Sequence, residues 1–396
     1  MLTIENVQTA RRERLLRGAD HWWFVGPGGI AKVRPEHLDA RDELIPQAEA
    51  SLRQAGLYDV QSFSVYSLTV LTSTDCNLGC GYCFQNTAQD ATGGNRPPRI
   101  KHARLTSETI GKILEFTGRQ MAEVELHRLG IMLFGGEPLL NLKGCKELLT
   151  RAADYGMRSA QMISNGVLLT PLVAKALGER GLRSIQITFD GDQADHDKIR
   201  VRRSGGGTFD TIVDNIARAT DASSVRWELR VNVSHHTRAG VDTLIDRLAE
   251  RLDPKRCALY FTRVGDIGVG YENDLLHSGE LASDFIGWNR RVLAAGFRVP
   301  MPQAQAACQA CSYRDGRYGA VVNPDGTLYS CWETSGKADW EVGSITDGYL
   351  PADQTAGRWV GCGHEYQFAD DELALRRFAD TVDAAVLDEL SAAGKL

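Results

Sequence analysis

The sequence predicts an α/β fold: a partial (β/α)6 barrel of the TIM type with smaller segments at both ends. Six strand candidates, most of them short apolar runs, alternate with segments of helical character over about 200 residues, which is typical of parallel strands crossed by helices. Hydrophobic residues make up 43% of the 396-residue chain, enough for a large core. Seven of the nine cysteines fall in two groups, residues 76–83 and 308–362, which suggests that the members of a group share a site.

Helix candidates with polar starts lie between the predicted strands. The strands cover residues 65–72, 129–134, 158–164, 183–189, 227–233 and 258–264. The helices cover residues 106–121, 142–155, 171–180, 209–222 and 241–252.

Both flanks of the barrel have their own character. Residues 1–62 predict a small α+β cap with a charged helical start, a hairpin at 21–35 and a helix at 40–55. This cap either packs on the barrel or offers a strand edge to an extended peptide substrate. After the core at 63–297, residues 298–369 predict a β-hairpin domain, with Asn-Pro-Asp-Gly at 323–326 as its turn, and residues 370–396 a closing helix.

Charge and hydropathy exclude several classes of protein. A formal charge of −6 gives no basic surface for nucleic acid or anionic lipid. No apolar run approaches the ~18 residues of a membrane span, and the first twenty residues lack the apolar core of a signal peptide. We expect a cytoplasmic protein, in which clustered thiols are more typical of metal or catalytic sites than of disulfides.

The first cysteine cluster follows the first predicted strand. Cys76, Cys80 and Cys83 have the spacing C-x3-C-x2-C, with Tyr82 before the last thiol. Three thiolates on one loop can hold three corners of an iron–sulfur cube and leave one iron open for chemistry. A zinc knuckle is the alternative, but the nearest downstream histidine, His102, lies nineteen residues on.

Five segments, in order between residues 66 and 264, resemble the radical S-adenosylmethionine (SAM) enzymes. The cysteine loop resembles their signature loop, which holds a [4Fe-4S] cluster. Later segments resemble the subgroup with a SPASM or twitch extension, which includes anaerobic sulfatase maturases and peptide-modifying enzymes. The segments are CNLGCGYCFQN (76–86), FGGEPLL (134–140), SNG (164–166), ITFDGDQADHDKIR (187–200) with GGGTFD (205–210), and RVNVS (230–234).

The resemblance implies a SAM site at the carboxyl ends of the strands. Glu137 would meet the methionine ammonium, and glycine backbone would approach the ligand without a Cβ in the way. Ser164 and Asn165 would meet the ribose or carboxylate, and Tyr82 would offer an aromatic edge to the adenine or simply pack. The implied SAM-binding residues are Tyr82, Gly135, Gly136, Glu137, Pro138, Ser164, Asn165 and Arg200.

A second thiol set surrounds the C-terminal hairpin. Cys308, Cys311, Cys331 and Cys362 resemble the start of a SPASM extension, which carries two auxiliary clusters. Four thiols satisfy only one cube, so the shorter twitch extension with one auxiliary [4Fe-4S] cluster is the better match. Four cysteines also suit tetrahedral zinc, and His364 is a further candidate ligand.

Three residues have candidate roles with simple structural alternatives. Asp190 follows the fourth strand and would contact substrate or accept a proton, or else cap a turn. Arg200 would contact SAM or a substrate carboxylate, or else form a surface ion pair. Cys257 would donate a hydrogen atom, or else be an inert buried thiol.

The resemblance implies a radical SAM oxidoreductase that cleaves SAM to a 5′-deoxyadenosyl radical and takes hydrogen from a peptide, such as a ribosomally made precursor undergoing cross-linking or oxidation. Its implied partners are that peptide and an electron donor such as flavodoxin or ferredoxin. The alternatives are a dehydrogenase of a small molecule, such as an aminoglycoside or sugar, and a non-catalytic zinc-bound scaffold.

Overall fold

The computed structural model describes residues 13–60, 62–265, 271, 273–304, 313, 315–359 and 372–396. One ten-stranded sheet dominates this part of the chain, in the order β13-β12-β11-β10-β4-β5-β6-β7-β8-β9. The six strands from β4 to β9 are mutually parallel and follow one another in sequence, which confirms the predicted partial (β/α)6 barrel. These strands are β4 (Tyr66–Ser73), β5 (Leu129–Gly135), β6 (Met157–Ile163), β7 (Leu182–Phe189), β8 (Arg226–Val233) and β9 (Cys257–Arg263).

The predicted C-terminal hairpin is present, and it belongs to the same sheet. β10 (Gly319–Val322) lies parallel to β4, with Val321 opposite Thr69. β11 (Thr327–Tyr329) returns antiparallel beside it, and β12 (Glu341–Ser344) and β13 (Gly348–Tyr349) continue the meander. The described strands after residue 298 therefore extend the barrel sheet at its β4 side.

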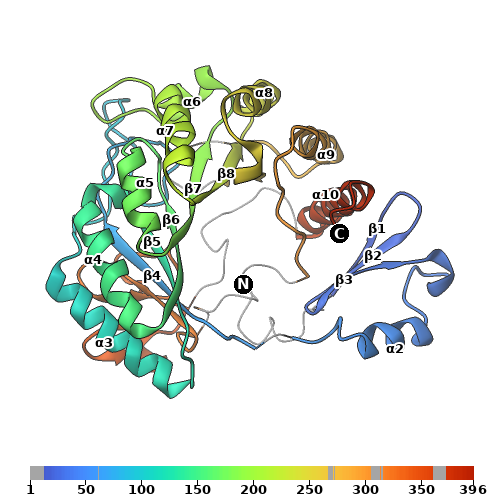
Figure 1. Cartoon of the computed structure of the whole chain (residues 1–396), viewed down its shortest axis with the longest axis horizontal. Coiled ribbons are helices and arrows are strands. Elements are labelled where there is room, and N and C mark those ends of the chain that lie inside the picture. Colours follow the sequence, from blue (N-terminus) through green and yellow to red (C-terminus); the bar gives the residue numbers. More distant parts are fainter. Residues whose placement is uncertain are drawn as a thin grey trace.

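Helices cover the convex face of the sheet (Figure 1). The five predicted helices are present, and side-chain caps fix several of their starts; Thr106, for example, accepts from the Thr109 N–H. Two further helices, α6 and α9, were not predicted. The helices are α3 (Ser107–Glu123), α4 (Leu142–Ala152), α5 (Pro171–Gly178), α6 (Gln193–Ile199), α7 (Phe209–Ala222), α8 (Val241–Arg251) and α9 (Gly279–Ala294). Short 3-10 turns are η1 (Pro35–His37), η2 (Pro138–Asn141), η3 (Ala153–Tyr155), η4 (Arg238–Gly240), η5 (Pro254–Arg256) and η6 (Ala352–Gln354).

A separate antiparallel sheet forms near the N-terminus. It contains β1 (Arg14–Arg17), β2 (Trp22–Gly26) and β3 (Gly29–Val33), followed by α2 (Pro46–Gln54). The hairpin prediction is confirmed, whereas the predicted helical start is wrong for Arg14–Arg17, which pairs with β2 as a strand. This sheet packs against α10 (Glu372–Ala392), the predicted closing helix.

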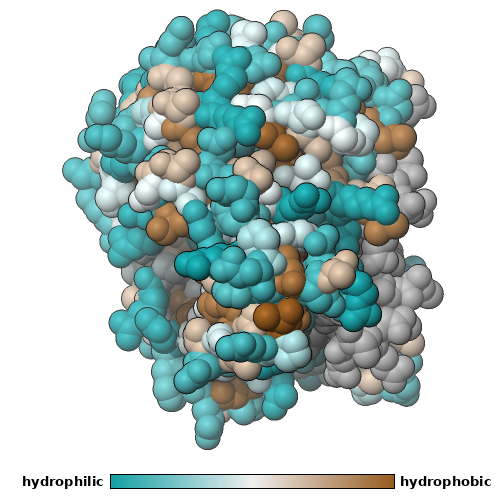
Figure 2. All heavy atoms as spheres, turned by 90° about the vertical axis from the view of Figure 1, so that its right-hand side faces the viewer, coloured by the Kyte–Doolittle hydropathy of each residue, from teal (hydrophilic) through white to brown (hydrophobic). Residues whose placement is uncertain are grey.

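The N-terminal sheet and α10 share apolar and ionic contacts. Leu16 and Trp23 pack on Leu387, which is fully buried. Arg14 forms ion pairs with Asp380 and Asp383 at 2.7 and 2.6 Å. Figure 2 shows that this side of the molecule is mostly hydrophilic, with hydrophobic residues in small separate groups. Within the described segments, no helix combines the length and apolar character needed to cross a lipid bilayer.

Candidate active site

The cysteine loop begins where β4 ends. Because the strands are parallel, the ends of β5, β6 and β7 lie at this same edge of the sheet. Gly135, Ser164 and Asp190 follow or close those three strands. The structure therefore brings the predicted candidates of four strand ends to one edge.

Backbone bonds shape the cysteine loop. The Cys83 N–H donates to the Cys80 carbonyl (3.3 Å), and the Asn86 side-chain amide donates to the same carbonyl (2.9 Å). Isolated bridges join Leu78 to Arg202 and Asn86 to Arg99. All three loop cysteines are free thiols in half-buried positions.

Arg99 lies against the thiols, which sequence reasoning missed. Its guanidinium donates to Cys83 Sγ at 3.4 Å and is anchored by Gln85 Oε1 at 2.6 Å. Burial raises the pKa of the Cys76 thiol, and the Arg99 charge opposes that rise. Burial also raises the pKa of Cys80 to about 12. Burial thus favours the neutral thiol at Cys76 and Cys80 until a positive charge, such as a metal, compensates the thiolates.

The donor set fits a cluster better than a single metal ion. A zinc ion needs its thiolate ligands within about 2.3 Å of one point. In the described part of the chain, no three His, Cys, Asp or Glu side chains are arranged to hold one metal ion. A [4Fe-4S] cube instead takes each thiolate on a different iron, and its sulfurs accept hydrogen bonds. Cys76 Sγ already accepts from the Leu78 N–H (3.4 Å) and the Asn165 amide (3.7 Å).

Gly135 and Gly136 allow two backbone segments to meet. A Cβ on Gly135 would lie 2.2 Å from the Ser73 carbonyl oxygen, and one on Gly136 would lie 2.2 Å from that of Asp75. Gly135 also has φ +135°, which favours glycine. The pair therefore fastens the end of β5 to the start of the cysteine loop. Pro138, two residues after Gly136, begins the turn η2.

The Glu137 carboxylate is completely buried and organises the neighbouring loop. One oxygen accepts from the Leu139 N–H (3.0 Å) and the Ser164 hydroxyl (2.9 Å), and the other accepts from the Asn165 N–H (2.7 Å). Burial raises the pKa of Glu137, and these hydrogen bonds oppose the rise. In this structure Glu137 fixes Ser164 and Asn165 beside Cys76.

Tyr82, Asp190 and Arg200 form a buried polar network. The Tyr82 hydroxyl donates to Asp190 Oδ2 (2.8 Å) and accepts from Arg200 Nη1 (2.6 Å), and the Tyr82 ring stands edge-on to Tyr271 (5.3 Å between centroids). Burial raises the pKa of Asp190, opposed by the Arg200 charge. Burial alone lowers the pKa of Arg200, but Tyr82, Cys80 and Asp190 hold it above its ordinary value. The ion pair, 3.6 Å between Arg200 Nη1 and Asp190 Oδ2, is thus internal to the site.

His196 supports this network from behind. The Asp190 N–H donates to His196 Nδ1 (3.4 Å), and His196 Nε2 lies 3.1 Å from the Thr208 hydroxyl. A neutral ring with its proton on Nε2 satisfies both contacts. Burial lowers the pKa of His196 well below its ordinary value, and the Arg200 charge lowers it further.

Cys257 does not join the other candidates. It opens β9, at the opposite edge of the sheet from the cysteine loop, and lies beside the fully buried Trp227 in the core under the helices. Cys331 is buried after β11. Cys308, Cys311 and Cys362 lie outside the described residues.

Aromatic rings connect Cys331 with the cysteine loop. Trp332 lies 6.1 Å from Phe134 between ring centroids, and Phe134 stacks on Phe84 at 6.2 Å. Phe84 directly follows Cys83. No pattern in the sequence indicated this row, or the approach of Arg99, because both depend on how distant segments fold together.

Known proteins are similar to this chain in sequence or in fold. Mycofactocin maturase MftC from Mycolicibacterium smegmatis is 26% identical over 320 residues, 73% of each chain. Fe-coproporphyrin III synthase from Methanosarcina barkeri is 27% identical over 213 residues, 53% of this chain and 48% of that protein, so the chain spans about half its length. A solved structure of anSMEcpe with bound AdoMet and the Cp18Cys peptide has a similar fold, with a TM-score of 0.59 at 16% identity over 84% of this chain and 99% of that one.

The family match coincides with the site. Residues 70–248 match the family model described as Radical SAM superfamily, a range that holds the cysteine loop, Glu137, Ser164, Asp190 and Arg200. Three free thiols that fit a cluster, together with this match, identify residues 70–248 as a radical SAM domain.

Proposed function

We propose that this protein is a radical SAM oxidoreductase that acts on a peptide. One observation carries the proposal: Cys76, Cys80 and Cys83 are free, close to the Arg99 cation, and held where four parallel strands end. The bound cluster and SAM would supply a 5′-deoxyadenosyl radical by reductive cleavage of the sulfonium, with the electron coming from a donor such as flavodoxin or ferredoxin.

The chain's own residues would bind and shield the reactants. Cys76, Cys80 and Cys83 would hold the cluster, and Asn165, which contacts Cys76 Sγ, would lie beside the SAM ribose or carboxylate. Glu137 would keep that loop in place and present its negative charge near the methionine ammonium. The buried Asp190–Arg200 pair would close the site to water on the β7 side.

We further propose one auxiliary [4Fe-4S] cluster on Cys308, Cys311, Cys331 and Cys362. The ring row Phe84–Phe134–Trp332 supports this assignment, because it spans the interval between the cysteine loop and Cys331. A cluster with four protein ligands has no open iron for substrate, so its role there would be electron transfer. Removal of an electron from a substrate radical makes net oxidation or cross-linking the natural outcome.

The peptide substrate rests on relatives. The subgroup motifs resemble those of peptide-modifying enzymes, and the MftC match, to a protein named as a maturase, extends over 73% of both chains. A ribosomally made precursor is therefore the substrate we favour. The match to Fe-coproporphyrin III synthase favours a small molecule as the second candidate.

Anaerobic reconstitution tests the chemistry. We expect about eight irons and eight sulfides per chain, and 5′-deoxyadenosine and methionine after reduction with SAM present. Replacing Cys76, Cys80 and Cys83 together by alanine should abolish cleavage, whereas Cys308, Cys311 and Cys331 replaced together should leave about four irons. Zinc in the purified protein with no 5′-deoxyadenosine would contradict the proposal.

Deuterium transfer tests the substrate. A candidate precursor deuterated at the modified carbon should give deuterated 5′-deoxyadenosine. Deuterated aminoglycosides, sugars and porphyrins should leave the 5′-deoxyadenosine free of deuterium. Transfer from a small molecule alone would favour the second candidate.

Residues 1–62 are proposed to dock the precursor. Among the described residues β3 pairs with β2 alone, so its other edge would accept an added strand. Deleting the segment should weaken precursor binding, but it also uncovers α10. Lys32→Glu on β3 is therefore the second variant, and unchanged affinity in both would refute docking here.

A further inference from the structure

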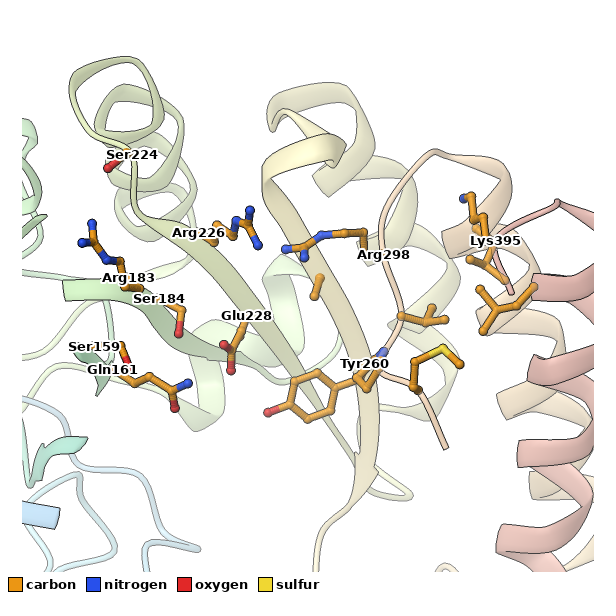
Figure 3. A pocket seen from close by; sticks show the side chains of 16 residues that line it. Ser159, Gln161, Arg183, Ser184, Ser224, Arg226, Glu228, Tyr260, Arg298 and Lys395 are labelled. Atoms are coloured by element: carbon orange, nitrogen blue, oxygen red, sulfur yellow. The ribbon is translucent and has the colours of Figure 1, made fainter. Parts of the chain in front are cut away.

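A cavity of about 990 Å³ opens at the N-terminal edge of the sheet, on the opposite side from the cysteine loop (Figure 3). The first residues of β6 to β9, the segment 298–301 and the end of α10 surround it. Figure 3 shows Gln161, Glu228 and Tyr260 lining its interior. Its volume lies at the upper end of the range for ligand sites.

The rim of the cavity is cationic, although the whole chain has a net charge of −6. Arg183, Arg226, Arg298 and Lys395 line it and are exposed, and Glu228 is the one carboxylate among the described lining residues. Within the described ranges, none of the four cations has a carboxylate at ion-pair distance. The exposed Arg291 of α9, by contrast, forms ion pairs with Asp242 and Asp246.

Arg226 and Arg298 point toward one another in Figure 3. The sheet register fixes the positions of Arg226 and Arg298. Arg298 forms a β-bridge with Ala258 of β9. Ala258 in turn pairs with Glu228 of β8, which lies two residues after Arg226. Two guanidinium groups that face each other repel unless an anion lies between them. Carboxylates fit guanidinium forks with two parallel hydrogen bonds.

A polar strip leads from this rim to the candidate active site. On β8, the alternate side chains Arg226, Glu228, Arg230 and Asn232 share the concave face, whereas Trp227 between them is fully buried on the other face. A packed barrel would carry branched aliphatic residues here. Arg230 and Asn232 are hydrogen-bonded (2.9 Å), and the strip ends near Asp190, where both residues oppose the rise in pKa that burial causes.

We propose that this cavity binds an acidic segment of the peptide substrate, with Arg226 and Arg298 as its carboxylate-binding pair. The inference rests on the proposed function and deepens it by naming the substrate's chemistry. The strip from Arg226 to Asn232 spans roughly 20 Å at the rise of a β-strand. An extended peptide covers that distance in about six residues, so the acidic residues lie about six positions from the modified residue.

Fluorescence anisotropy tests the binding with the full-length protein. The probes are fluorescein-labelled octapeptides of alternating Gly with Glu, Gln or Lys, and an eight-nucleotide oligo(dT). We expect the Glu peptide to bind at least about tenfold more tightly than the Gln and Lys peptides, and added salt to weaken it. Arg226→Gln with Arg298→Gln should weaken it about tenfold.

The control changes the same charge elsewhere. Lys175→Gln with Arg218→Gln, on exposed positions of α5 and α7, should leave the affinity for the Glu peptide unchanged. Arg226→Glu with Arg298→Glu should reverse the preference toward the Lys peptide, and circular dichroism checks that the variants fold. Equal binding of the Gln peptide, or unchanged binding by both Arg226/Arg298 variants, would overturn the proposal. Tighter binding of oligo(dT) would overturn it in favour of nucleic acid.

A separate measurement isolates the proposed function. Cleavage of SAM by the reduced, reconstituted wild-type protein without peptide reports on the radical chemistry alone. Cleavage without selective Glu-peptide binding refutes the acidic-substrate site and leaves the enzyme assignment intact. Selective binding without cleavage refutes the enzyme assignment and leaves the binding site intact.

Discussion

At the scale of single residues, Arg99 places a positive charge against the cysteine loop. It reaches Cys83 Sγ and the Thr74 carbonyl together, from a segment that folds back over the loop. A cation at this position opposes the rise in the pKa of Cys76, and it would lie next to a cluster held by the loop. It thus links the chemistry of the loop with the position of residues 99–104.

Arg99→Met should make the Cys76 thiol less reactive. Burial raises the pKa of Cys76, and without the guanidinium the opposing Arg99 charge is lost, so alkylation of Cys76 by iodoacetamide at pH 8 should slow by about three- to tenfold in the metal-free protein. Mass spectrometry of Cys76 over time measures this. Arg104→Met, an exposed neighbour, should leave the rate unchanged. Equal rates in Arg99→Met and wild type would contradict the role assigned to Arg99.

His196 should make stability depend on pH. Its pKa is depressed in the folded protein, so below about 6.5 the unfolded chain binds a proton that the folded chain does not. The contribution of neutral His196 to the free energy of unfolding is present above that pH. It is lost as the pH falls toward the pKa of His196 in the folded protein, and the free energy of unfolding then falls by up to about 1.4 kcal/mol per pH unit.

Urea unfolding between pH 5 and 8 measures this dependence. His196→Gln should flatten the fall in the free energy of unfolding below pH 6.5, even though it lowers the value at pH 7.5. His127→Gln, at an exposed position, should keep the wild-type slope. The same slope in wild type and His196→Gln would show that other groups cause it.

At the scale of elements, periodicity predicted the barrel well. All six predicted strands agree with β4 to β9 to within two residues at each end, because most of them carry apolar runs that are buried in the sheet. β1 escaped prediction because Arg-Leu-Leu-Arg has no alternation, and its strand form depends on pairing with β2. β10 pairs with β4 although some 250 residues separate them in the sequence, and local sequence patterns do not predict pairing between such distant strands.

The candidate site divides in the same way. Cysteine spacing and the strand ends located Cys76, Glu137, Ser164 and Asp190 from sequence alone. Their hydrogen bonds were not predictable: Glu137 appeared as a ligand contact, yet its oxygens are occupied by Ser164 and two backbone N–H groups. Side-chain partners of this kind depend on loop conformations within fractions of an ångström.

Leu387→Ala should loosen the N-terminal sheet from α10. The side chain is fully buried against Leu16 and Trp23, so its truncation should cost about 2–4 kcal/mol of unfolding free energy. Leu373→Ala on the same helix removes a half-exposed leucine and should cost less than about 0.5 kcal/mol. Thermal unfolding followed by circular dichroism compares them. Similar costs would mean that the β1–β3 sheet does not depend on this helix.

At the scale of the whole molecule, the cysteine loop connects segments that are distant in sequence. It begins at β4, bridges to Arg99 and Arg202, and accepts a hydrogen bond from Asn165 after β6. A cluster bound to the loop would therefore stabilise the whole barrel edge, because a ligand that binds only the folded state raises its stability.

Removing iron should lower the melting temperature by about 5 °C or more. Anaerobic calorimetry of the reconstituted and the chelator-treated protein measures the difference. The variant with Cys76, Cys80 and Cys83 replaced by alanine should lose most of this gain. An equal gain in that variant would place the stabilising iron elsewhere in the chain.

The pairing of β10 with β4 has a practical consequence for anyone who shortens this chain. A barrel that ends near residue 297 would leave β4 as an edge strand, with a row of unpaired N–H and C=O groups from Ser67 to Val70. Such an edge recruits strands from other molecules and promotes aggregation. The radical SAM domain and the strands that follow it should therefore be expressed and purified together.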